Sequence, residues 1–184
     1  MQILRLVATG AALLVVAGCG DGGTILDPTS PAPAAQDRSS DFSASPARKV
    51  QASGHFAAVV NFATLTLTPR GRNCLLQVDG QLNFTGTIVG AAVGQTTALV
   101  FAPCSDVAAN PPGTFRDRFK SELVFEGTVD GEPARANVLY MGRVQPGGEI
   151  VGRILFSRGV QGRLEIEETI VAVGGEYSGS VVIR

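Results

Sequence analysis

Hydrophobic and polar residues follow three successive patterns along the chain. Residues 6–18 are almost all small or apolar and lead into Cys19, and residues 21–49 are rich in Pro, Ala, Ser, Asp and Gly without apolar periodicity. After residue 50, short apolar runs alternate with polar positions. A period of two is typical of β-strands with one buried face. The pattern predicts one folded domain, residues 51–184, made of strands.

Turn signals divide this domain into short segments, and no amphipathic helical stretch of useful length interrupts them. The turn signals are Asp79-Gly80, Asp130-Gly131, Pro146-Gly147-Gly148 and Gly174-Gly175. The expected strands are residues 54–68, 74–78, 81–88, 96–102, 114–129, 133–144, 149–157, 163–173 and 177–183. Such a series predicts an all-β fold, a single antiparallel β-barrel of about eight or nine strands in meander order, because closure removes exposed edges.

The alternation also assigns side chains to the two faces of the barrel wall. In residues 114–129 one parity is mainly apolar and is expected to face the lumen: Phe115, Asp117, Phe119, Ser121, Leu123 and Phe125. The other parity carries Arg116, Arg118 and Lys120 and is expected to face water. The same reasoning places Tyr140 in the lumen, together with its small neighbours Ala134 and Ala136.

One segment leaves two interpretations open. In residues 163–173, Leu164 and Ile166 share a parity with Glu168, so strict alternation turns a carboxylate inward. A β-bulge near Glu167 and Glu168 would shift the phase and leave Glu168 in solvent. We favour the bulge.

The N-terminal segment has the features of an export signal. Arg5 precedes an apolar run that is shorter than the roughly 20 residues a membrane-spanning helix needs. Val16-Ala17-Gly18-Cys19 resembles the lipobox of bacterial lipoproteins, with Val in place of the more frequent Leu three positions before the cysteine. The resemblance implies lipidation of Cys19 and cleavage before it. The alternative is an ordinary secretory signal that leaves Cys19 as an odd thiol.

These features predict residues 1–18 as a signal peptide and residues 19–50 as a lipidated cysteine followed by a disordered linker. Lipid chains on Cys19 would anchor the protein outside the cytoplasm. Residue 20 is Gly, whereas Asp directly after the lipidated cysteine retains enteric lipoproteins at the inner membrane. The resemblance therefore favours the outer membrane where a cell has two membranes, and otherwise the outer face of the cell membrane.

The other two cysteines, Cys74 and Cys104, fit an oxidising compartment. Neither has a second Cys or a His at the spacing of a zinc site, and the chain has a single His, His55. We expect a disulfide between them, the alternative being two buried free thiols.

The C-terminal half carries glycine-punctuated hairpins: VFEGTVDGEPA, GGEIVGRILFSRGVQGRLEI and VGGEYSGSVVIR. In residues 121–184 this cadence resembles allene oxide cyclase, dirigent-like barrels and the uncharacterised bacterial proteins that share their fold. The resemblance implies a barrel, which in the plant enzymes holds a hydrophobic ligand. It assigns no functional residue to this sequence.

The sequence lacks the residues that several kinds of functional site require. A catalytic triad has no base other than His55 and no nucleophile elbow, and neither clustered metal ligands nor a phosphate-binding glycine loop is present. We predict no cofactor and no metal site. The chain has 15 Lys and Arg against 16 Asp and Glu and no Trp, which argues against nucleic acid as a partner. The row Arg116, Arg118 and Lys120 could meet lipid headgroups or envelope polysaccharide, but a solvated strand face is favoured.

Two functions from different classes remain. The favoured one is a membrane-tethered binding or structural module, whose barrel is either packed or holds one small apolar ligand. The alternative is a barrel enzyme of the cyclase or isomerase kind, with Asp117, Glu168 or Tyr140 as its candidate catalytic residues. A packed lumen would exclude ligand and enzyme alike, whereas an open lumen lined by Asp117 and Tyr140 would favour the enzyme.

Overall fold

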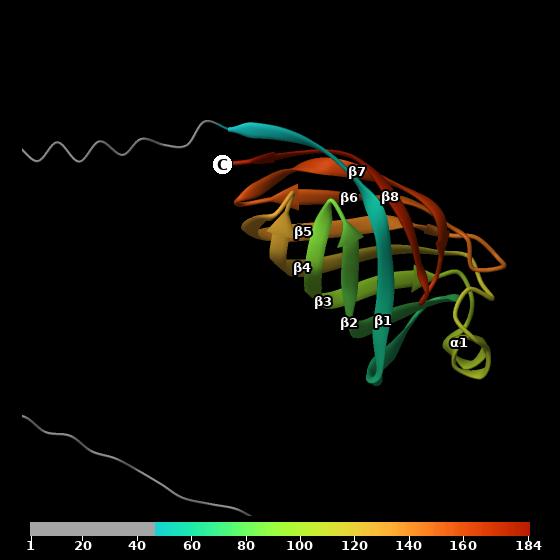
Figure 1. The fold of residues 1–184 in the computed structure, drawn as a ribbon. Coiled ribbons are helices and arrows are strands. Elements are labelled where there is room, and N and C mark those ends of the chain that lie inside the picture. Colours follow the sequence, from blue (N-terminus) through green and yellow to red (C-terminus); the bar gives the residue numbers. More distant parts are fainter. Residues whose placement is uncertain (1–46) are drawn as a thin grey trace, which may run out of the picture. The chain divides into compact units, whose positions relative to one another are not determined.

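The computed structural model describes residues 47–184, which form eight antiparallel strands and one short helix (Figure 1). The strands pair in sequence order and β1 also pairs with β8, so the sheet closes into a barrel. The elements are β1 (Arg48–Arg70), β2 (Asn73–Gly86), β3 (Ile88–Val100), α1 (Cys104–Ala109), β4 (Asp117–Val129), β5 (Glu132–Val144), β6 (Ile150–Ser157), β7 (Val160–Ile170) and β8 (Gly174–Ile183). The expected all-β meander barrel is therefore confirmed.

Two of the expected turns are wrong. Asp79-Gly80 lies inside β2, where Gly80 pairs with Gly94 of β3 and with Val60 of β1. The two segments expected on either side of this turn are thus one strand, which reduces nine segments to eight. The turn before β8 is formed by residues 171–173, so Gly174-Gly175 begins the strand. In contrast, Asp130-Gly131 and Pro146-Gly147-Gly148 do form hairpin turns.

The pairing of β1 with β2 is irregular next to Asp79. The ladder between β1 and β2 shifts register between Asn61 and Thr66, so several residues of β1 oppose Val78 alone. The backbone N–H of Asp79 donates to Thr64 Oγ1 at 2.9 Å instead of to a strand carbonyl. The barrel wall bends here without reversing the chain. The dipeptide Asp79-Gly80, which is typical of a hairpin turn, therefore lies at a bend within a strand of this barrel.

The meander topology gives the barrel two different ends. The connections β1–β2, β3–β4, β5–β6 and β7–β8 lie at one end, which also carries α1 and is called the α1 end below. The other connections lie at the opposite end, where β1 begins at Arg48 and pairs with Ile183 near the end of β8. Arg48 precedes the expected domain start at residue 51. The proposed signal peptide and Cys19, together with nearly all of the proposed linker, lie outside the described residues.

Side chains fill the lumen at the end opposite α1. Phe84, Phe125, Phe156 and Tyr177 are almost fully buried, and their rings meet edge to face with centroids 5.7–6.1 Å apart. Aromatic pairs prefer this geometry, which adds to the stabilisation from burial. Ile154, Leu164 and Val181 complete the layer with no exposed surface. This half of the barrel is a packed core.

The Tyr177 hydroxyl closes the core at the β2–β3 turn. It accepts a hydrogen bond from the Ile88 N–H at 3.0 Å and lies 3.1 Å from the Thr85 carbonyl oxygen, to which it donates. Burial raises the pKa of Tyr177. The Tyr177 hydroxyl thus has both a donor and an acceptor partner, and these two hydrogen bonds hold the β2–β3 turn against β8.

Candidate functional site

The α1 half of the lumen is open, and a cavity of about 370 Å³ occupies it. Its lining is mainly apolar, and all eight strands contribute to it. β6 and β7 contribute only one terminal residue each, Ile150 and Ile170. Exposed residues such as Phe62 and Val59 take part in the lining, so the cavity reaches solvent at the α1 end. Its volume lies within the roughly 300–1,000 Å³ range of small-molecule sites. The barrel thus combines a packed half with an open half.

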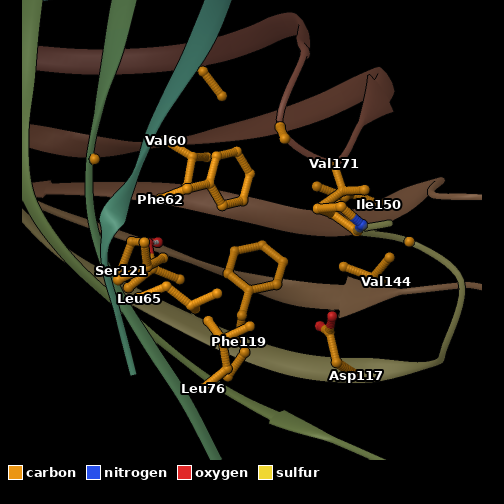
Figure 2. Close-up of a pocket in the computed structure, with 18 of the residues that line it drawn as sticks. Val60, Phe62, Leu65, Leu76, Asp117, Phe119, Ser121, Val144, Ile150 and Val171 are labelled. Carbon is orange, nitrogen blue, oxygen red and sulfur yellow. Dashed lines mark hydrogen bonds between the residues drawn. The ribbon is translucent and has the colours of Figure 1, made fainter. Parts of the chain in front are cut away.

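Figure 2 shows how the side chains surround this space. The rings of Phe62 and Phe119 point into it from β1 and β4, and the Asp117 carboxylate lies beside Phe119 and Val144. Val171 and Ile150 lie on the same side of the view as Val144 and Asp117, and Phe62 and Leu65 lie on the other side. The cavity has an apolar body and one acidic corner.

The disulfide between Cys74 and Cys104 holds part of the cavity wall in place. The expected pair is present, with Cα atoms 4.9 Å apart, and it ties the first residue of α1 to β2. Cys74 is buried with Val100 and Ala102, and Val107 and Phe115 pack against them. Val107 and Phe115 also line the cavity. The cross-link therefore fixes the connection between β3 and β4 over the open lumen.

Asp117 occupies the acidic corner, as its parity predicts. It is the first residue of β4 and faces Val144, the last residue of β5. Burial is the larger effect on its carboxyl and raises the pKa of Asp117 to about 6, against a smaller lowering by the backbone of Val144. Oδ1 is buried and has no hydrogen-bond partner within residues 47–184. An unpaired acceptor in apolar surroundings is costly to the fold, which is typical of a group reserved for a ligand or for chemistry.

Tyr140 lies next to this corner on β5 and also faces the lumen as expected. Its side chain is 5% exposed, and its ring meets Phe119 and Phe56 edge to face at 4.8 Å and 5.8 Å. Burial, with the charge of Asp117 second, raises the pKa of Tyr140, so the phenol stays protonated. Its hydroxyl is the other buried side-chain polar atom without a partner in the barrel domain. An unpaired donor and an unpaired acceptor thus belong to the lining of one cavity.

Two further polar groups of the lining satisfy one another. Ser121 and Thr96 face the cavity from neighbouring strands, and their hydroxyl oxygens are 2.7 Å apart. Sequence parity predicts Ser121 inside, whereas its pairing with Thr96 depends on the register between β3 and β4, which no local pattern encodes. This pair adds polarity without leaving an unpaired group.

Glu168 is not part of the site. The ladder between β7 and β8 shifts register between Glu167 and Ile170, and Glu168 is exposed with a φ of 45°. The favoured bulge is confirmed, and Thr169 takes the buried position instead. Glu168 does not line the cavity, so Asp117 and Glu168 do not form a carboxylate pair there.

His55 and the basic row are also outside the lumen. His55 lies on the exposed face of β1, 3.5 Å from Glu176 of β8. Arg116, Arg118 and Lys120 are exposed as expected, and Lys120 pairs with Glu122 at 2.7 Å. Within the described part of the chain, no cluster of potential metal ligands occurs and no helix is long and apolar enough to cross a membrane.

The parity of Phe115 and Phe119 is correct, but neither is fully buried. Both side chains are partly exposed because they line the open half of the lumen, whereas Phe125 lies in the packed half and has no exposed surface. Alternation identifies the face of a strand but not the half of the barrel that is filled.

No family model, no curated protein and no solved structure matches this chain.

Proposed function

We propose that this chain is a membrane-tethered, extracytoplasmic lipoprotein whose barrel binds one small apolar ligand in the open half of its lumen. The observation that carries the proposal is the cavity of about 370 Å³, apolar over most of its lining and with two residues in that lining, Asp117 and Tyr140, that each bear an unpaired polar atom. Ligand sites typically combine an apolar body with a few placed polar groups. The ligand's chain fills the apolar space, and its polar group meets Asp117 and Tyr140.

The tether rests on the sequence. The lipobox-like Val16-Ala17-Gly18-Cys19 favours lipidation of Cys19, and Gly20 favours the outer membrane where there are two. The barrel of residues 47–184 would then lie outside the cytoplasm, which agrees with the disulfide between Cys74 and Cys104. The similarity of residues 121–184 to allene oxide cyclase and dirigent-like barrels agrees with a ligand in the lumen.

Mass spectrometry of the protein purified from its native membrane tests both parts together. We expect the mass of a lipid on an N-terminal Cys19, and a small apolar molecule released when the protein is denatured. Replacing Cys19 with Ala should abolish the lipid and release the protein from membranes or leave an uncleaved precursor. Normal processing and membrane retention of this variant would contradict the anchor, and a barrel that never carries or binds an apolar molecule would contradict the binding function.

A barrel enzyme of the cyclase or isomerase kind is the second candidate. An open lumen lined by Asp117 and Tyr140 is the feature expected of it, and a carboxyl with a pKa of about 6 suits proton transfer near neutral pH. Against it, the described cavity lining offers one half-buried carboxyl, that of Asp117, and no second group paired with it as a general base. Incubation of the identified ligand with the protein distinguishes the two, because an enzyme converts it and loses this conversion in Asp117→Asn, whereas a binding protein returns it unchanged.

A further inference from the structure

Resting on the proposed binding function, we propose that the ligand is a cationic amphiphile, namely an apolar chain that ends in a primary ammonium group seated at Asp117. The unpaired Asp117 Oδ1 is the group that would receive it, and the unpaired Tyr140 hydroxyl belongs to the lining of the same cavity. The proposal concerns only the charge and chemistry of the ligand's polar end.

The charge of the cavity lining has one sign. Asp79 and Asp117 are its carboxylates, and no Lys, Arg or His is among the lining residues. Asp79 is exposed and accepts a hydrogen bond from Gln95 Nε2 at 3.3 Å, so its charge is screened by water and already has a partner. Asp117 is the carboxylate that an entering ligand would meet in apolar surroundings.

The nearest basic residues face away from the lumen. Arg116 and Arg118 flank Asp117 on β4, and Arg143 precedes Val144 on β5, but all three belong to the opposite parity and are exposed. None of them forms an ion pair with a carboxylate of the described chain, Asp117 included. Together with Asp117 they line a second pocket, so their charges reduce the negative potential at this carboxylate. None of them is a hydrogen-bond partner of Oδ1, which stays unpaired within the described chain.

An ammonium group matches two features of this corner. It can donate to the unpaired Asp117 Oδ1, and the ring of Phe119 lies beside this carboxylate (Figure 2) and can stabilise a cation. Oppositely charged groups attract strongly where water is excluded. A carboxylate ligand would instead repel Asp117, and an alcohol would donate to the carboxylate without charge pairing.

The three ligand classes differ in their dependence on pH. Binding of ammonium requires ionised Asp117, so affinity should fall about tenfold between pH 7.5 and pH 5, because the pKa of Asp117 is about 6. A fatty acid should show the opposite trend, because protonation of either carboxyl removes the repulsion. An alcohol should bind with little dependence on pH.

Calorimetric titration with three probes of one chain length, n-octylamine, n-octanol and octanoate, tests the proposal on the full protein. At pH 7.5 we expect n-octylamine to bind at least tenfold more tightly than n-octanol, and octanoate to bind most weakly. Asp117→Asn should remove the preference for amine while leaving n-octanol affinity within about threefold. Glu168→Gln, which removes an exposed carboxylate outside the cavity, should leave all three affinities unchanged.

The outcomes separate the ligand class from the binding function. If n-octanol binds as tightly as n-octylamine, if octanoate binds best, or if the amine preference survives Asp117→Asn, the cationic ligand is refuted while apolar binding stands. If none of the probes binds at either pH, the proposed function itself fails. Should Asp117→Asn not fold, the pH series on the unmodified protein decides the question.

Discussion

Two residues illustrate what the sequence could and could not reveal at the scale of single side chains. The alternation in β4 and β5 was enough to place Asp117 and Tyr140 in the lumen, because a pleated strand turns every second side chain to the same face. It could not reveal that both would lack hydrogen-bond partners, since that depends on which groups of other strands reach them. Burial of Asp117 follows from the register with Val144, which no local pattern encodes.

Replacement of Asp117 by Asn should stabilise the protein at neutral pH. Burial raises the pKa of Asp117 from 3.8 to about 6, so the folded chain binds a proton more tightly than the unfolded chain between about pH 4 and pH 6. The contribution of this group to stability therefore decreases as pH rises through that window and is unfavourable above it. Asn keeps the shape and carries no charge.

Denaturant unfolding at several pH values checks this prediction. Asp117→Asn should be more stable than the unmodified protein at pH 7.5, and the difference should shrink as the pH is lowered to 4. Glu168→Gln serves as the control and should show no such trend, because Glu168 is exposed. A variant that is less stable at pH 7.5 would show that the carboxylate is better solvated or paired than the geometry indicates.

At the scale of elements, hydrophobic periodicity predicted the strands well and the turns less well. Glycine marks hairpin turns, but it also occurs within strands of a coiled barrel wall, where Gly80 faces Gly94. The sequence alone does not distinguish these two uses of glycine. For this reason Asp79-Gly80 and Gly174-Gly175 were wrongly predicted as turns. The bulge at Glu168 was recognisable because an inward carboxylate conflicted with burial, whereas α1 is too short, at six residues, to leave a periodic signal.

The two faces of β4 should differ in their sensitivity to mutation. Phe125 has no exposed surface and contacts the rings of Phe84 and Phe156, so Phe125→Ala should cost about 3–5 kcal/mol of unfolding free energy. Arg118→Ala on the exposed face should cost less than about 0.5 kcal/mol. Phe119→Ala should be intermediate, because Phe119 lines the cavity and is partly exposed. Equilibrium denaturation measures all three, and equal sensitivity of the two faces would contradict the assigned parity.

The disulfide should stabilise both the domain and its ligand site. Cys74 and Cys104 are 30 residues apart in sequence, and a loop of this size corresponds to about 3–4 kcal/mol in the chain-entropy description. Reduction should lower stability by that order and weaken ligand binding, since Val107 and Phe115 pack against the cross-link and line the cavity.

Thiol labelling of the denatured, unreduced protein is the direct measurement for this pair. Neither Cys74 nor Cys104 should react before reduction, and both should react after it. Stoichiometric labelling of both without reductant would refute the disulfide in the protein as it exists.

At the scale of the whole molecule, the fold class and the closure of the sheet were predictable, but the division of the lumen was not. Whether a barrel is packed or open depends on how side chains from all eight strands meet across it, and residues of identical type serve both purposes: Phe125 fills the packed half and Phe119 borders the cavity. The cavity lies at the α1 end of the barrel, and β1 begins with Arg48 at the opposite end. A tethered chain would enter the barrel at the packed end.

The central claim is that this cavity binds an apolar molecule, and methyl NMR during titration with n-octanol tests it most directly. The account predicts saturable shifts at Leu76, Val144 and Val171, which line the cavity, and unchanged signals from Ile154, Leu164 and Val181 in the packed half. The absence of saturable shifts, or shifts confined to the exposed outer-face residues Val89, Val93 and Val124, would contradict it.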